Sequence, residues 1–341
     1  MLRGAVIGLG NIATRGHLPA YRDNEVSRNL EIVAVMDVVE QNKEKAREHV
    51  PGAAFYTDID ELLSREKLDF VDICTPPHTH AEYIRACASK GLHIICEKPL
   101  TETNATVDAL SGLIKGSKIV FVPCHQYKYS PLWKSIRDVI FSGGIGDVTI
   151  AQFNVFRLHA DSGTAAWNPE WRTNKKHSGG GILVDTGAHY FYLTQYLFGI
   201  PQNVSSVLRT LKHHEYGVED TALVTLEYPG ALVQINLTWA ANSRSNSAFI
   251  IGTKGSLAYD GSRLIQTSEG ISKELPMPDV SDKKQYIGWY AALFTEFASR
   301  VVEKNCCEDL LNEAVVVMKL LDLCYRSKGN KIQREYPAGL E

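Results

Sequence analysis

Three polar side chains, Lys98, Asp185 and His189, are of the types that general acid–base chemistry on an alcohol requires. A histidine near its operating pKa can take a proton from a hydroxyl group, and a lysine can donate a hydrogen bond to the oxygen as charge develops there. Asp185 and His189 are four positions apart, so a helix places both on one face, where the carboxylate can orient the imidazole or bind substrate hydroxyls. We therefore expect His189 as the principal base, Lys98 as the polarising partner and Asp185 as the orienting residue. Which of Lys98 and His189 holds the mobile proton stays open, because interacting groups titrate as a unit.

Each of these residues also has an ordinary structural explanation. Lys98 can be a surface lysine at the end of a strand, and aspartate is a common helix N-cap, which suits Asp185 equally well. A histidine on an apolar helix is more often a satisfied core residue than a catalyst, which applies to His189. Their joint occurrence, rather than any one of them, favours the chemical interpretation.

A glycine-rich turn follows the first apolar run of the chain. Its sequence is Gly8-Leu9-Gly10-Asn11-Ile12-Ala13, which fits G-x-G-x-x-G/A between a strand and a helix. Gly8 permits a tight turn, and Gly10 lets backbone N–H groups approach a pyrophosphate at a helix N-terminus. The alternative is a glycine turn in an α/β protein without a cofactor. The order strand, turn, helix, strand, acid favours a dinucleotide site that includes Asn11 and Ile12.

Asp37 stands at the end of the second predicted strand, where a carboxylate can accept hydrogen bonds from the adenosine ribose. A 2′-phosphate would meet this negative charge, and the following residues, Val38 and Val39, offer no arginine to receive it. The sequence therefore favours NAD(H) over NADP(H).

Strands and helices alternate through the first 125 residues. This alternation predicts βαβ units and a doubly wound parallel sheet, hence an NAD-binding Rossmann domain over residues 1–125. The expected strands are 2–7, 30–36, 54–56, 70–74, 93–96 and 119–122, and the helices between them include 11–22, 79–89 and 103–115.

Residues 126–341 have a different pattern. After predicted helices at 131–142 and 184–198, several runs alternate in period 2 without intervening helices, which predicts an open, mainly antiparallel sheet in an α+β domain for substrate binding and oligomerisation. The expected strands are 148–158, 204–211, 221–227, 231–238, 248–252 and 255–259, with hairpin turns at 228–230 and 253–255, and final helices at 286–302 and 308–326.

Composition excludes several classes of protein. The chain has 341 residues, 36 Lys+Arg against 39 Asp+Glu, and a formal net charge of −3, so a general nucleic-acid binder is not expected. No apolar run approaches the length of a membrane span, and residues 2–10 predict a strand and turn rather than a signal peptide. Seven cysteines without a C-x-x-C pattern suit reduced thiols and a cytoplasmic location.

Two further motifs, read with the glycine turn, resemble the glucose–fructose oxidoreductase / inositol dehydrogenase (Gfo/Idh/MocA) family over nearly the whole chain. They are Cys96-Glu97-Lys98-Pro99-Leu100 and Ser178-Gly179-Gly180-Gly181-Ile182-Leu183-Val184-Asp185-Thr186-Gly187-Ala188-His189. The resemblance implies a Lys98–Asp185–His189 catalytic set, a cis Lys98–Pro99 peptide, and a homodimer or homotetramer assembled through the C-terminal sheet.

The resemblance also implies the remaining site residues. Cofactor contacts are expected from Glu97 and Lys98, and from Thr75, Pro76 and His80, whose loop in the family passes near the cofactor. Substrate contacts are expected from Asp185, His189, Tyr127, Trp171 and Arg172, where tryptophan offers a platform for a sugar face and arginine a hydrogen-bonding fork. Tyr192 stands where many relatives have aspartate, which puts transfer of a particular substrate in doubt.

These expectations combine into an NAD(H)-dependent oxidoreductase that acts on a secondary alcohol or ketone of a sugar, nucleotide sugar or cyclitol. Two alternatives stay open: a non-catalytic NAD-sensing or partner-binding protein, and an enzyme that uses NAD transiently for redox-assisted elimination or glycoside cleavage. No metal is expected, since neither the His78-x-His80 pair nor His213-His214 has further ligands nearby in sequence.

Overall fold

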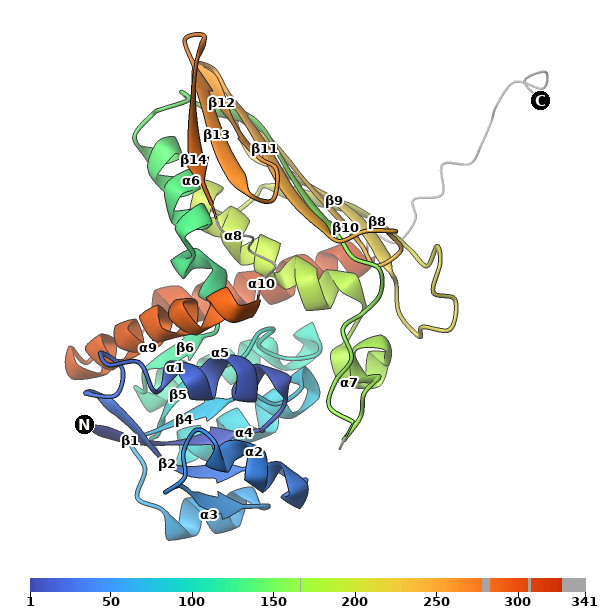
Figure 1. Ribbon diagram of the computed structural model, residues 1–341. Coiled ribbons are helices and arrows are strands. Elements are labelled where there is room, and N and C mark those ends of the chain that lie inside the picture. The colour runs from blue at the N-terminus through green and yellow to red at the C-terminus, as the bar shows by residue number, and fades with distance from the viewer. Residues whose placement is uncertain (166, 278–282, 306–307, 327–341) are drawn as a thin grey trace.

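Two β-sheets with a layer of helices between them organise the computed structural model, which describes residues 1–165, 167–277, 283–305 and 308–326 (Figure 1). The first sheet has six parallel strands in the order β3-β2-β1-β4-β5-β6. Its strands are β1 (Leu2–Ile7), β2 (Leu30–Met36), β3 (Ala54–Tyr56), β4 (Phe70–Ile73), β5 (His93–Cys96) and β6 (Phe121–Pro123). This confirms the expected Rossmann arrangement, in which the strand order reverses between β1 and β4 and opens a crevice at their carboxyl ends.

The crossovers of this sheet are helical, as the sequence predicts. They contain α1 (Leu18–Ala20), α2 (Lys43–Arg47), α3 (Ile59–Arg65), α4 (Pro77–Ser89) and α5 (Val107–Ser117), with 3₁₀ turns η2 (Glu40–Asn42) and η3 (Asn104–Thr106). The first helix begins at residue 11 but passes through a π-helical turn, η1 (Ala13–His17), and ends at Ala20 rather than Arg22. A π-turn inside a helix often marks a functional position, and this one places His17 beneath the crevice.

The second sheet has eight strands in the order β14-β13-β12-β11-β7-β10-β9-β8. It is mainly antiparallel, as expected, although its central strands β7 and β10 pair in parallel. The strands are β7 (Val148–Phe156), β8 (Asn203–Arg209), β9 (Thr221–Glu227), β10 (Leu232–Thr238), β11 (Ser245–Gly252), β12 (Gly255–Tyr259), β13 (Arg263–Ser268) and β14 (Ile271–Pro276). The pattern did not reveal β13 and β14, because these strands lie at the sheet edge and alternate weakly between apolar and polar residues.

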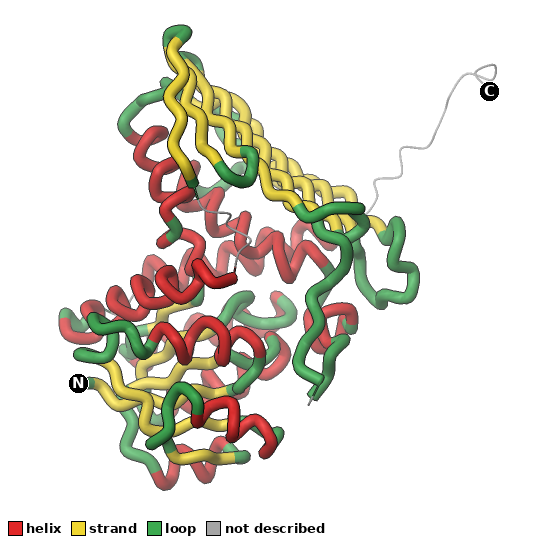
Figure 2. Tube along the Cα trace, in the orientation of Figure 1, coloured by secondary structure: helices red, strands yellow, loops and turns green. Residues whose placement is uncertain are grey.

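Helices cover the inner face of the second sheet and separate it from the first (Figures 1 and 2). The last two, α9 (Tyr286–Val302) and α10 (Glu308–Arg326), pack against both halves: α10 contacts β8 and α8 on one side and β6 and α5 on the other. The others are α6 (Pro131–Phe141), α7 (Lys175–Ser178) and α8 (Ala188–Phe198), with a π-turn η6 (Leu183–Gly187) and 3₁₀ turns η4 (Gln126–Tyr129), η5 (Trp171–Thr173) and η7 (Lys283–Gln285).

Five cysteines in the described part of the chain, at positions 74, 87, 96, 124 and 324, are buried free thiols. Cys306 and Cys307 lie outside the described residues. Among the helices that the structure describes, none is long and apolar enough to cross a membrane.

Candidate active site

A cavity of about 400 Å³ lies between the two sheets, at the carboxyl ends of β1, β4 and β5. It brings together most of the residues predicted from sequence, although they come from segments far apart in the chain. Its walls include Gly8, Gly10, Asn11, Ile12, Asp37, Thr75, Pro76, Glu97, Lys98, Tyr127, Trp171, Arg172, Asp185 and His189.

The glycine turn and Asp37 form one end of this cavity. Gly8 has a φ of +92°, which favours glycine, and a Cβ there would meet the Thr75 side chain at 2.7 Å. Gly10 is different, because a Cβ at this position meets no protein atom within 4 Å. The protein itself therefore does not require glycine at position 10, whereas the close approach of a pyrophosphate does. The residues present thus fit a dinucleotide cofactor.

The carboxylate of Asp37 is 8% exposed and held by the backbone. Its Oδ2 accepts a hydrogen bond from the Leu9 N–H at 2.7 Å, and its Oδ1 accepts one from the Val39 N–H at 2.8 Å. Each carboxylate oxygen can accept a second hydrogen bond, so the group remains able to receive ribose hydroxyls.

His80 occupies a different position from the one expected. It is completely buried on α4, and the cavity wall does not include it. Its Nε2 lies 2.7 Å from the Thr75 carbonyl oxygen and its Nδ1 lies 2.9 Å from the Pro99 carbonyl oxygen. His80 therefore joins the two loops that line the cavity, because helix α4 turns its ring inward beneath them.

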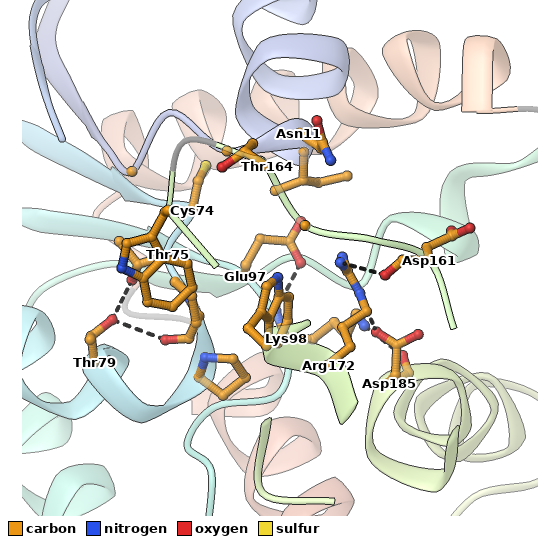
Figure 3. A pocket seen from close by; sticks show the side chains of 18 of the residues that line it. Asn11, Cys74, Thr75, Thr79, Glu97, Lys98, Asp161, Thr164, Arg172 and Asp185 are labelled. Atoms are coloured by element: carbon orange, nitrogen blue, oxygen red, sulfur yellow. Dashed lines mark hydrogen bonds and ion pairs between the residues drawn. The ribbon is translucent and has the colours of Figure 1, made fainter. Parts of the chain in front are cut away.

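The Lys98–Pro99 peptide is cis, as the resemblance implies. Lys98 extends from the end of β5 across the cavity, and its Nζ donates a hydrogen bond to the backbone oxygen of Asp185 at 2.6 Å (Figure 3). The neighbouring Glu97 is 7% exposed, and its Oε2 accepts a hydrogen bond from the Lys98 N–H. The motif thus links the first sheet directly to η6.

Beneath Glu97 lies a buried ionic cluster that the sequence analysis did not identify. His17 Nδ1 lies 2.8 Å from Asp72 Oδ2, and His17 Nε2 lies 3.1 Å from Glu97 Oε1. Tyr290, from α9, donates its hydroxyl to Glu97 at 2.6 Å. Burial alone would lower the pKa of His17, but the charge of Asp72, the neighbouring Cys74 and the hydrogen bonds to both together outweigh burial and raise that pKa well above the usual value.

The donor atoms of this cluster, together with Cys74 or Cys124, lie close enough to surround a metal ion. A metal requires a neutral imidazole nitrogen with a free lone pair. Both nitrogens of His17 face carboxylates, and its raised pKa favours the protonated form. The arrangement therefore suits an ion-pair cluster that fixes Glu97 better than it suits a metal centre.

His189 lies in α8 with its ring stacked on Tyr127, at a centroid distance of 4.3 Å and an interplanar angle of 6°. Its Nδ1 lies 2.8 Å from the Tyr192 hydroxyl, which also accepts a hydrogen bond from the Tyr127 N–H. Burial lowers the pKa of His189 well below its usual value, and the positive charge of Lys98 lowers it further. The imidazole is thus held neutral, with Nε2 as the nitrogen left for a ligand.

Asp185 lies in the π-turn η6 and makes a different contact from the one expected. Its Oδ1 accepts a hydrogen bond from Arg172 Nε at 3.2 Å, and Arg172 also donates to the backbone oxygen of Asp161 (Figure 3). The hydroxyl of Tyr192, rather than the carboxylate of Asp185, contacts His189. The π-turn accounts for the difference, because it changes the angular offset that an i, i+4 pair has on a regular α-helix.

A second ionic group stabilises the loop that carries Tyr127. Glu313 of α10 accepts a hydrogen bond from His125 Nδ1 at 2.5 Å and pairs with Lys128 Nζ at 2.9 Å. Burial would raise the pKa of Glu313, but the His125 hydrogen bond and the Lys128 charge lower it to about 2. The ring of His125 stacks on Tyr192, so this group supports both contacts of His189.

Several cavity residues belong to no sequence motif and were not predicted. They lie at strand ends, in the loop after β7 and on α9, where spacing carries no signal. They include Arg157, Asp161, Trp167, Arg244, Tyr286 and Tyr290.

Comparisons with known proteins agree with this architecture. Residues 2–123 match the model of the oxidoreductase family with an NAD-binding Rossmann fold, and residues 133–258 match that of the GFO/IDH/MocA C-terminal domain. D-glucoside 3-dehydrogenase of Escherichia coli is 24% identical over 346 residues, covering 96% of this chain and 95% of that protein. Trans-1,2-dihydrobenzene-1,2-diol dehydrogenase of Mus musculus is 26% identical, covering 84% of this chain and 82% of that protein.

Solved structures share the fold. An oxidoreductase from Agrobacterium radiobacter, in complex with NAD⁺, L-tartaric acid and magnesium, superposes with a TM-score of 0.86 at 18% identity, covering 96% of each chain. An oxidoreductase from Thermotoga maritima gives a TM-score of 0.83 at 24% identity, covering 96% of this chain and 97% of that one. The chain therefore belongs to the Gfo/Idh/MocA family of NAD(P)-binding oxidoreductases.

Proposed function

We propose that this protein is an NAD(H)-dependent dehydrogenase or reductase acting on a secondary alcohol or ketone of a sugar, nucleotide sugar or cyclitol. The observation that carries the proposal is the meeting of Lys98 Nζ and a neutral, buried His189 in the cavity that begins at the dinucleotide turn. Relatives named as a D-glucoside 3-dehydrogenase and a levoglucosan dehydrogenase act on carbohydrates, and another is named as a diol dehydrogenase, which supports this substrate class.

The nicotinamide, when bound, supplies the hydride acceptor or donor. The protein must then move the hydroxyl proton, and in this proposal Nε2 of His189 accepts it, since the lowered pKa keeps the imidazole neutral. Lys98 Nζ can donate a hydrogen bond to the same substrate oxygen as negative charge develops on it. The carbonyl oxygen of Asp185 fixes this ammonium group, so it is oriented before a substrate binds.

The remaining substrate contacts come from aromatic and polar side chains of the cavity wall. Trp171 offers an aromatic face suited to the C–H side of a sugar ring, and Arg172 is stacked over it at 4.4 Å. The Asp185 carboxylate keeps one oxygen beyond its Arg172 pair, which can accept a substrate hydroxyl. In this proposal Asp185 therefore binds substrate, and Tyr192 orients the base.

The test is a screen of sugars, uronates, cyclitols and nucleotide sugars for NADH formation, repeated with Lys98→Ala and His189→Ala. Each variant is expected to lower kcat on the order of 10²-fold or more, because each removes a group that contacts the reacting oxygen. Lys90→Ala and His214→Ala remove the same side-chain types from exposed positions outside the cavity and serve as controls. Near-normal turnover in both cavity variants would refute the assignment.

The same screen separates the two alternatives. No NADH formation with any compound, despite tight NADH binding, would indicate a non-catalytic NAD sensor. Conversion of substrate without net NADH accumulation would indicate transient use of NAD in elimination or glycoside cleavage.

We also infer a homodimer or homotetramer assembled through the outer face of the second sheet. That face carries half-exposed apolar side chains on neighbouring strands, and Leu232 of β10 lies directly beside Ile150 of β7. Leu223 of β9 and Phe249 of β11 add to the same surface at 48% and 42% exposure. Contiguous apolar surface on several strands is typical of a protein–protein interface.

A further inference from the structure

Two arginines stand side by side where β7 and β11 meet the cavity. Arg157 directly follows β7, and Arg244 directly precedes β11. These strands pair antiparallel with Phe156 opposite Ser245, so the next positions along the ladder are Arg157 and Arg244. Both residues line the cavity.

The guanidinium of Arg157 is fixed by uncharged groups. Its Nη1 donates hydrogen bonds to the carbonyl oxygens of Phe156 and Ser245 at 2.8 and 3.0 Å, and its Nη2 donates to Asn246 Oδ1 at 2.8 Å. Arg172 is different, because it forms an ion pair with the Asp185 carboxylate (Figure 3). Arg157 is therefore rigidly placed, while its charge is not matched by an ion pair among the described residues.

Two like charges opposite each other on paired strands destabilise a sheet. Burial lowers the pKa of Arg157, and the positive charge of Arg244 lowers it further, as expected for two neighbouring cations. An anion that binds to both guanidinium groups would turn the repulsion into attraction.

The pair lies close to the proposed reaction centre. The hydroxyls of Tyr127 and Tyr286 are 2.7 Å apart. Burial raises the pKa of Tyr286 to about 12 even though the Tyr127 hydrogen bond and the charges of both arginines oppose the rise, so both arginines act on this hydroxyl. The Tyr127 ring in turn stacks on His189. One molecule with its hydroxyl at His189 can thus carry a charged group past Tyr127 toward the arginines.

We propose that Arg157 and Arg244 form an anion subsite, and that the substrate is an acidic sugar or cyclitol derivative whose carboxylate or phosphate group binds there. This inference rests on the proposed function, since it places the acidic group on the same molecule that is oxidised or reduced. It narrows that function by excluding neutral sugars as preferred substrates.

The experiment measures binding separately from turnover. D-glucose, D-glucuronate and D-glucose 6-phosphate are titrated calorimetrically into the enzyme saturated with NADH, a complex in which an alcohol cannot be oxidised. At least one of the two acidic probes is expected to bind about tenfold or more tightly than glucose, because charge-assisted hydrogen bonds exceed neutral ones by this order. The carboxylate and phosphate arms identify which anionic group the subsite accepts.

Arg157→Gln and Arg244→Gln are each expected to reduce the preference for the acidic probe at least about fivefold. Arg244→Gln is the second variant because Arg157 also ties the ends of β7 and β11 together. Arg65→Gln removes the same charge from an exposed position on α3 and should leave the preference unchanged. Acidic probes that bind no better than glucose, or a preference that survives in both cavity variants, would overturn the proposal.

Assay of the same proteins for NADH formation from NAD⁺ keeps the two proposals apart. An arginine-dependent preference without turnover of any compound would leave the anion subsite in place and refute the dehydrogenase. Turnover of glucose that neither arginine variant affects, with no preference for acidic probes, would support the dehydrogenase and refute the anion subsite.

Discussion

Replacement of Asp37 by asparagine tests how the protein selects its cofactor. The carboxylate cannot turn away from an incoming group, because the N–H groups of Leu9 and Val39 hold its two oxygens at 2.7 and 2.8 Å. An additional 2′-phosphate on the ribose that it binds would bring like charges to about 4 Å, which corresponds to about 4 kcal/mol at an effective dielectric constant of 20. A shift of the ribose away from Asp37 and screening by salt both reduce this repulsion energy. We therefore expect NADH to bind about 10²-fold more tightly than NADPH.

Asp37→Asn removes the charge and keeps the shape of the side chain. NADPH affinity is expected to rise about tenfold or more, since the repulsion disappears, while NADH affinity falls about tenfold through loss of the charged acceptor. Fluorescence titration of both reduced cofactors measures this, and Asp60→Asn on the exposed side of α3 is the control for the change in net charge. The reasoning fails if the unmodified protein binds NADPH as tightly as NADH, or if the ratio of the two affinities is the same in Asp37→Asn.

Three other substitutions test the supporting contacts and the assembly. Tyr192→Phe should lower kcat about tenfold with little change in KM and should shift the pH profile of kcat/KM, because it removes the hydroxyl that contacts His189 Nδ1. An unchanged pH profile and an unchanged kcat would contradict a positioning role for Tyr192. Glu313→Gln should lower the free energy of unfolding by about 3 kcal/mol at neutral pH, since the pKa of this carboxyl falls from 4.5 to about 2 on folding. That stabilisation exists above the unfolded pKa and is lost as the pH falls from about 4.5 toward about 2. The free energies of unfolding of the two proteins, measured with denaturant, should therefore differ at neutral pH and converge at acidic pH. A difference that stays constant with pH would contradict this prediction. Leu232→Arg should reduce the molar mass found by light scattering to that of a smaller assembly, and an unchanged mass would exclude this face as the interface.

The parts of the site that follow local rules were predictable from the sequence. The glycine turn and Asp37 depend on a strand, a turn and a second strand that lie within 37 residues of each other, so spacing alone places them together. The Lys98 and His189 motifs could be identified separately, and both residues line one cavity in the folded chain.

The parts that depend on tertiary contacts could not be predicted. The carboxylate of Asp185 turns to Arg172 because of a π-turn that the sequence pattern does not signal, and Tyr192 takes the place beside His189. His80 has a side chain of a type that binds ligands, but its ring lies between the carbonyl oxygens of Thr75 and Pro99 and outside the cavity wall. Arg157 and Arg244 become neighbours only through the register of β7 and β11, whose ends are nearly ninety positions apart in the chain.

The hydrogen bond from Tyr290 to Glu97 spans 193 residues of sequence and has a consequence for synthesis. During translation, the six strands of the first sheet leave the ribosome long before α9 does, so His17, Asp72 and Glu97 are all synthesised well before Tyr290. Until α9 docks, Glu97 lacks the hydrogen bond that Tyr290 donates in the folded protein. The N-terminal sheet can thus form early, whereas the geometry around Lys98 is completed only when nearly the whole chain has been synthesised.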